Sequence, residues 1–273
     1  MDNSVLCDWC RQGNIEGVAA LLQAGANPNV YDEEGWAPIH YAVENRNFEL
    51  TQMLLAAGAE VNVLTSSMYT AFSIMIETAG YSVEMARLLI EAGADVGTPL
   101  HEAIYLQNYN RIVQLLAEQT TPVNEADYGG NTPLHGAVAI RDLKVVELLL
   151  QAGADINARD AYDTTPLHAA CADGFPEIAL LLLDKGASIE CEDYNGRTPI
   201  IFASGNDTEE IVLLLSQRGA AINHKDKFGN TALHYAFENG LTDIASRLIE
   251  LGANPELLNN EGQTPVDLLP SED

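Results

Sequence analysis

Residues 165–193 read TPLHAACADGFPEIALLLLDKGASIECED, and the fold can be inferred from the pattern in this stretch. Thr165 suits the N-cap of a helix, and Pro166 suits the first helical position, where a missing N–H costs nothing. Gly186 suits the left-handed residue that ends a second helix. Asp193 suits the start of a tight turn. The stretch therefore predicts two short helices followed by a turn.

The same pattern recurs along the whole chain. A Thr-Pro phrase, written TPLH or as variants such as API, TAF, TPI, TAL and TPV, is anchored at positions 37, 70, 98, 132, 165, 198, 231 and 264. A Gly-Ala phrase accompanies it, starting at Gly25, Gly58, Gly93, Gly153, Gly186, Gly219 and Gly252, and the last four are 33 residues apart. Since one helix pair cannot bury its leucine face alone, such units gain stability by stacking on their neighbours.

These residues, in this order and at this period, closely resemble the ankyrin-repeat family over about the whole chain. The resemblance implies an all-α fold, a curved solenoid of stacked helix pairs with short β-hairpin fingers. It implies a single domain, residues 1–273, in which 1–30 and 257–273 are the N-terminal and C-terminal caps. The repeats between the caps are expected at 31–62, 63–96, 97–124, 125–157, 158–190, 191–223 and 224–256.

The pattern breaks in one region. Regular units place twelve residues between the Gly and the next Thr, whereas Gly93 to Thr98 spans only five, so seven residues of one finger are missing. The preceding repeat is two residues longer than the others, which predicts an enlarged inter-helix loop from Glu77 to Ser82. Two interpretations stay open: tolerated drift in a surface loop, or a bend or partner site within residues 66–110.

The charge balance excludes several classes of partner. Thirteen basic residues against forty acidic ones give a formal net charge of -27, which repels nucleic acid and anionic membranes. No basic, apolar leader opens the chain, and no apolar run reaches the length of a membrane helix, about eighteen residues. The four cysteines, Cys7, Cys10, Cys171 and Cys191, lack the spacing of a disulfide framework. We expect a cytoplasmic or otherwise intracellular monomer.

No residue stands out as catalytic. His40, His101, His135, His168 and His234 all end the TPLH phrase or its variants, and the resemblance implies that they are structural, tying neighbouring turns together. His224 is expected in a solvated finger loop. Cys7 and Cys10 form a CxxC without a second pair, which favours packing in the cap over a metal site. The chain has no GxSxG, Walker, HExxH or GxGxxG motif. We therefore expect no enzyme, no cofactor and no metal.

Aromatic residues close to the repeat anchors are stronger candidates for function. The resemblance implies that fingertip side chains face partners, and rigid aromatic side chains are favoured at protein interfaces. The alternative is that each ring packs on the adjacent finger. With residues at the ends of the first helices, these aromatics would line one concave face. The candidate partner-binding residues are Tyr31, Trp36, Glu44, Tyr69, Glu77, Tyr105, Tyr128, Ile140, Tyr162, Asp173, Tyr194, Asn206, Phe228 and Glu238.

These features favour a non-catalytic module that binds a protein partner, with a basic surface suited to the acids. An alternative is an acidic inhibitor or immunity-type protein that neutralises a basic enzyme, such as a nucleic-acid-binding one, by mimicking phosphate charge. A third is an enzyme, or a regulatory fragment of one. The first two differ in salt dependence, because a charge mimic loses affinity steeply as salt rises.

Overall fold

The computed structural model describes residues 3–77, 81–118, 121–206 and 208–270. In these ranges the chain forms sixteen α-helices and one 3-10 helix, and none of their residues lies in a β-strand. The chain divides into two compact units, Met1–Ile112 and Val113–Asp273, called here the N-terminal and C-terminal units. The boundary falls inside helix α8, Tyr109–Glu118.

The N-terminal unit is built from helix pairs. Its helices are α1 (Asn3–Arg11), α2 (Ile15–Gln23), α3 (Pro38–Glu44), α4 (Phe48–Ala56), α5 (Ala71–Glu77), α6 (Val83–Glu91) and α7 (Pro99–Tyr105). First helices pack on first helices, α1 on α3 and α3 on α5, and the second helix α2 packs on α4. Leu6, Val18, Leu50 and Leu54 are buried in the resulting core. The predicted stacking of helix pairs is confirmed here.

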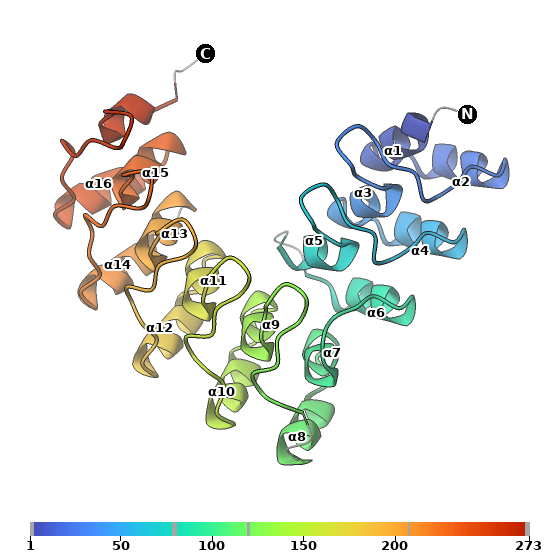
Figure 1. The fold of residues 1–273 in the computed structure, drawn as a ribbon, viewed down its shortest axis with the longest axis horizontal. Coiled ribbons are helices and arrows are strands. Elements are labelled where there is room, and N and C mark those ends of the chain that lie inside the picture. The colour runs from blue at the N-terminus through green and yellow to red at the C-terminus, as the bar shows by residue number, and fades with distance from the viewer. Residues whose placement is uncertain (1–2, 78–80, 119–120, 207, 271–273) are drawn as a thin grey trace. The chain divides into compact units, whose positions relative to one another are not determined.

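The C-terminal unit repeats the arrangement more regularly. Its helices are α9 (Pro133–Ala139), α10 (Leu143–Gln151), α11 (Pro166–Ala172), α12 (Pro176–Asp184), α13 (Pro199–Gly205), α14 (Glu209–Gln217), α15 (Ala232–Glu238), α16 (Thr242–Glu250) and the 3-10 helix η1 (Pro265–Leu268). Within this unit α9, α11, α13 and α15 form one row and α10, α12, α14 and α16 a second (Figure 1). Leu149, Leu182 and Leu215 are fully buried in these rows.

The helix ends lie where the sequence pattern predicts them. Helix α11 begins at Pro166 behind Thr165, whose extended backbone (φ -106°, ψ 165°) is that of an N-cap. Helix α12 ends just before Lys185, and Gly186 takes a positive φ of 95°. None of the helices in the described ranges is long and apolar enough to cross a membrane.

The lengths of the connections confirm both irregularities. A regular pair such as α11 and α12 is joined by three residues, 173–175, whereas α5 and α6 are joined by five, 78–82. Residues 78–80 of that loop lie outside the described residues. Consecutive pairs are regularly joined by fourteen residues that carry a finger, as at 185–198, but α6 and α7 are joined by seven, 92–98. The finger predicted to be missing is absent from this connection.

Candidate partner-binding site

Four of the five fingers of the C-terminal unit are tight turns organised by one aspartate, and in the fifth Asn259 takes that place. In the finger at 160–164, the Asp160 carboxylate accepts the N–H groups of Tyr162 and Thr164, both at 2.8 Å. The Asp160 N–H donates to the Thr164 carbonyl at 3.0 Å and closes the turn. Asp127, Asp193 and Asp226 accept the corresponding pairs of backbone bonds in their own fingers. The fingers therefore take one shared conformation, in which each carboxylate compensates the turn's free amides.

Neighbouring fingers are joined by a ladder of backbone hydrogen bonds. In each later finger, the second residue of the turn donates its backbone N–H to the carbonyl of the third residue in the preceding finger. The four bonds, each 2.9 Å, run from Ala161 to Gly129, Tyr194 to Tyr162, Lys227 to Asn195, and Asn260 to Phe228. At Gly130, which has a φ of 79°, an added Cβ would lie 2.6 Å from the Ala161 nitrogen. The ladder holds the five fingers from residue 127 to 263 in fixed register.

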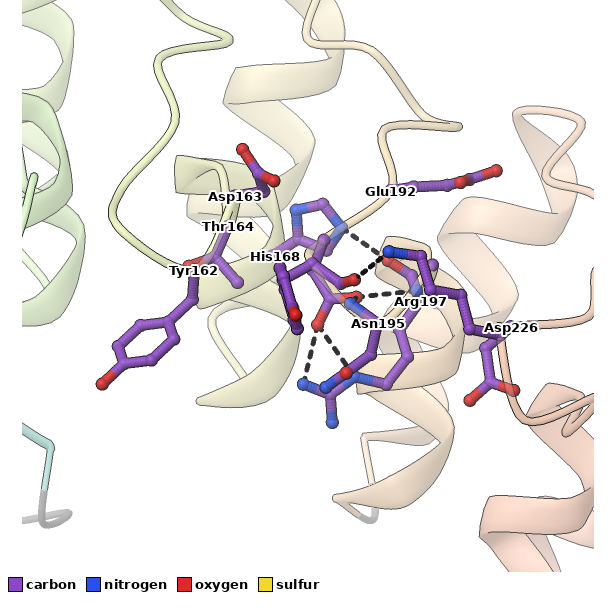
Figure 2. Close-up of polar contacts among 12 residues, drawn as sticks. Tyr162, Asp163, Thr164, His168, Glu192, Asn195, Arg197 and Asp226 are labelled. Atoms are coloured by element: carbon purple, nitrogen blue, oxygen red, sulfur yellow. Dashed lines mark hydrogen bonds and ion pairs between the residues drawn. The ribbon is translucent and has the colours of Figure 1, made fainter. Parts of the chain in front are cut away.

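The histidines of the TPLH phrases join one repeat to the next. His168 Nδ1 accepts the Thr165 N–H at 3.1 Å, and its Nε2 lies 3.1 Å from the Arg197 carbonyl oxygen, to which it donates (Figure 2). His40, His135 and His234 make the same two kinds of contact. Burial lowers the pKa of His168 to about 4, and it lowers the pKa of His40 and His234 as well. These histidines are structural hydrogen-bonding residues, as predicted.

Asparagines form a second set of ties that the sequence analysis did not identify. Asn124 donates to the Gly153 carbonyl at 3.3 Å and accepts the Asp155 N–H at 2.7 Å. Asn29, Asn62 and Asn223 bridge to the next Gly-Ala phrase in the same way. The recurring Asn after the Gly-Ala phrase was the signal available in the sequence. These side chains are engaged within the stack.

One finger base holds an ion pair in which the acid is buried and the arginine is partly exposed. The Asp193 carboxylate is 2% exposed and lies 2.7 Å from the Arg197 guanidinium, which also stacks 4.5 Å above the Phe202 ring. Figure 2 shows Arg197 and Asn195 within this polar cluster, while the Tyr162 ring points away from it. The cluster therefore stabilises the finger, and the aromatic ring remains at the surface.

The fingertip aromatics of the C-terminal unit are exposed. Tyr128 is 94% exposed, Tyr194 66%, and Tyr162 and Phe228 55% each. These four residues are called the fingertip aromatics below. The Lys227 ammonium lies 4.8 Å from the centre of the Tyr194 ring, a cation–π contact within the chain. Because the ladder already fixes the backbone beneath these rings, little backbone conformational entropy is lost when a partner binds them.

The first-helix ends give a mixed result in the C-terminal unit. Asp173 and Asn206 follow α11 and α13, and Glu238 ends α15, and all three are exposed. Ile140 follows α9 but is only 7% exposed, because it packs into the unit. The sequence expectation is corrected at Ile140, which has no surface to offer a partner.

In the N-terminal unit fewer candidates reach the surface. Tyr31 and Glu44 are exposed, and Tyr69 is partly buried. Tyr105 is only 3% exposed, and its ring packs edge-on against Phe72, which corrects the expectation for Tyr105.

Of the two remaining candidates in this unit, only Trp36 has a side chain within the described residues. The Trp36 ring is partly buried and stacks on Tyr41 with 5.0 Å between ring centres, so Trp36 serves packing. Glu77 ends α5, and its side chain lies outside the described residues.

Cys7, Cys10 and His224 are engaged within the structure. Burial raises the pKa of Cys7 to about 11 and that of Cys10 to about 12, so neither forms a thiolate at neutral pH. His224 is not the solvated residue that was expected, since its Nε2 lies 2.9 Å from the Gly196 carbonyl oxygen of the preceding finger. Within the described ranges no three His, Cys, Asp or Glu residues are grouped so that they could hold a metal ion.

Comparison with known families agrees with this architecture. Models of ankyrin repeats match residues 2–65, 72–160, 160–226 and 214–269. The chain belongs to the ankyrin-repeat family. Ankyrin repeats are generally non-catalytic modules of protein–protein interaction, so the family assigns this chain to that broad class.

The similar curated proteins match this chain over part of its length. The mitochondrial disaggregase of Bos taurus is 29% identical over 141 residues, 48% of this chain and 20% of that protein. Ankyrin repeat and SOCS box protein 3 of Homo sapiens is 33% identical over 86 residues, 31% of this chain and 17% of that protein. The nuclear factor NF-kappa-B p105 subunit of Gallus gallus is 33% identical over 130 residues, which are 44% of this chain and 13% of that protein. The chain matches a fifth or less of each of these relatives.

Proposed function

We propose that the C-terminal unit binds a protein partner through its fingertip aromatics and the exposed ends of α11, α13 and α15. The observation that carries this proposal is the exposure of four aromatic rings, 55% to 94%, on fingers locked together by backbone hydrogen bonds. Aromatic rings on a rigid support are the residues that most often anchor protein interfaces. Asp173 and Glu238 supply a polar rim of negative charge. The partner face is therefore expected to present apolar pockets beside basic groups.

A capture experiment tests the proposal. The wild-type protein, the triple variant Tyr162→Ala/Tyr194→Ala/Phe228→Ala and the double variant Glu147→Gln/Glu177→Gln are immobilised separately and exposed to the native lysate. Glu147 and Glu177 are exposed on the second helices α10 and α12, so the double variant is the control. We expect a protein retained by the wild type and the control but lost by the triple variant. Equal retention by all three proteins would place the site elsewhere.

The charge balance favours a second candidate, an inhibitor that neutralises a basic enzyme by charge mimicry. Within the described residues, Arg11, Arg159, Arg197, Arg218 and Arg247 form ion pairs with acids of the chain. The forty acids outnumber the thirteen lysines and arginines by twenty-seven, so most of the acids have no base to pair with one to one. Affinity for the captured partner that falls by orders of magnitude between about 50 and 200 mM salt would favour mimicry over an aromatic interface.

A further inference from the structure

The hydrogen-bonded ladder of fingers has an open first rung at Tyr128. Each later finger of the C-terminal unit donates one N–H to the finger before it, at 2.9 Å. The finger at 127–131 follows, in repeat order, the connection 92–98 that carries no finger. Among the described residues no group accepts the Tyr128 N–H. Within the described part of the chain, this donor is left for a group from outside.

The donor is held in a fixed orientation. The Gly130 N–H donates to the Asp127 carbonyl at 3.0 Å, which closes the turn around Tyr128. The Asp127 carboxylate accepts the Gly129 and Asn131 N–H groups at 2.9 and 2.8 Å. A partner that meets the Tyr128 N–H has no loop to order first, which lowers the entropic cost of binding.

The first finger of the N-terminal unit and the last finger of the C-terminal unit differ chemically from the finger at 127–131. The first finger of the N-terminal unit carries the exposed acid Glu33 at the position equivalent to Tyr128. The last finger of the C-terminal unit carries the exposed acid Glu261 at the position that offers the next carbonyl. Charges at such ends discourage the addition of another strand. At Tyr128 the chain instead presents an aromatic ring, 94% exposed, followed by two glycines.

The surroundings favour a basic occupant. Residues 118–140 contain the acids Glu118, Glu125 and Asp127 and no basic residue. The chain itself shows how a cation meets a fingertip tyrosine, since Lys227 Nζ lies over the Tyr194 ring and 2.5 Å from the Tyr194 carbonyl oxygen. Lys227 lies one repeat after Tyr194. The corresponding residue one repeat after Tyr128 is Ala161, which carries no charge.

We propose that an extended, lysine- or arginine-bearing segment of a partner protein docks at Tyr128. A backbone carbonyl of this segment accepts the Tyr128 N–H and so adds a rung to the ladder, while its cation lies on the Tyr128 ring. A second copy of this chain is disfavoured as the occupant, because each copy carries a net charge of -27. This inference rests on the proposed function and names the chemistry of the partner at one finger.

The probe is a short fluorescein-labelled peptide in which lysine alternates with valine, and its affinity is measured by anisotropy. Tyr128→Ala removes the ring and keeps the N–H, whereas Tyr128→Pro removes both. Proline is favoured at the second position of such a turn, so the finger should keep its shape. Glu33→Pro is the matched control, because the Glu33 N–H also has no partner among the described residues. The same peptide with glutamate in place of lysine controls for charge.

We expect Tyr128→Ala to weaken peptide binding about three- to fivefold, and Tyr128→Pro to weaken it a further two- to tenfold or so. Glu33→Pro and the wild type should bind alike, and the glutamate peptide should not bind. Hydrogen exchange of the Tyr128 amide should slow when the lysine peptide is present.

Three outcomes would overturn the inference: no binding of the lysine peptide to the wild type, equal affinity of the wild type and Tyr128→Pro, or self-association that Tyr128→Pro abolishes. If peptide binding instead depended on Tyr194 and Phe228 alone, docking at Tyr128 would be ruled out, but the proposed function would still stand. If lysate capture did not depend on the fingertip aromatics and peptide binding did not depend on Tyr128, both the proposed function and this inference would be wrong.

Discussion

Thr198 shows what the TPLH histidine contributes to one repeat. Thr165 and Thr198 are equivalent buried N-cap residues, and the Thr165 hydroxyl lies 2.9 Å from His168 Nδ1. In the next repeat Ile201 replaces the histidine, and the Thr198 hydroxyl oxygen is buried without a hydrogen-bond partner in the described part of the chain. A buried polar group in this state costs about 1–3 kcal/mol.

We therefore predict opposite effects for the same substitution at these two sites. Thr198→Val should leave the free energy of unfolding unchanged or raise it by up to about 1 kcal/mol, because it removes an unsatisfied hydroxyl. Thr165→Val should lower it by about 1–2 kcal/mol, because it leaves His168 without its hydroxyl partner. Urea unfolding of both variants measures the difference. Equal losses at the two positions would show that the hydroxyl of Thr198 has a partner after all.

The buried histidines make stability depend on pH. The pKa of His168 is about 4 in the folded protein, below its ordinary value of 6.5, because burial disfavours the charged ring. Between pH 6.5 and 4 the unfolded chain therefore binds more protons than the folded protein. The contribution of His168 to the free energy of unfolding is complete above pH 6.5 and is lost as the pH falls toward 4. The loss amounts to about 1.4 kcal/mol per pH unit for one proton.

The variant His168→Gln isolates this effect from the many carboxylates. We predict that its free energy of unfolding, measured in urea at pH 7 and pH 5, falls less across this interval than that of the wild type. An identical pH slope for the two proteins would mean that His168 titrates as an exposed histidine.

At the scale of the helix, packing on the neighbouring repeats carries the stability. Leu182 and Leu180 lie on the same helix α12, but Leu182 is fully buried whereas Leu180 is 40% exposed. We predict that Leu182→Ala lowers the free energy of unfolding by about 2–5 kcal/mol, because the stacked neighbours cannot collapse into the cavity. Leu180→Ala should cost less than about 1 kcal/mol. Chemical denaturation compares them, and similar costs would mean that the wrong face of α12 has been assigned to the core.

The helices were predictable because their signals are local. Thr165, Pro166 and Gly186 mark helix ends through their own backbone preferences, and the count of residues between Gly93 and Thr98 reveals the missing finger. The candidate site was less predictable, because exposure depends on residues about one repeat away. Tyr105 and Ile140 read as surface positions, yet both are buried by their neighbours. His224 read as a loop residue, but the carbonyl that it contacts belongs to the preceding finger.

At the scale of the molecule, the acidic charge acts on the folded state as a whole. The net charge is -27, and the acidic side chains repel one another most strongly when the chain is compact. We predict that raising sodium chloride from about 20 to about 300 mM increases the thermal midpoint, because salt shortens the range of this repulsion. Calorimetry at the two concentrations tests the prediction. A lower midpoint in high salt would show that favourable ion pairs outweigh the repulsion.

The central claim is that the fingertip aromatics of the C-terminal unit hold a protein partner. The most direct test measures association and dissociation rates of the captured partner by surface plasmon resonance. Tyr162→Ala, Tyr194→Ala and Phe228→Ala should mainly raise the dissociation rate, and Glu238→Gln should mainly slow association and weaken its salt dependence. Glu147→Gln and Glu177→Gln should change neither rate. If those two changes abolished binding while all three aromatic side chains could be removed without effect, the partner would bind the second helices and the claim would be wrong.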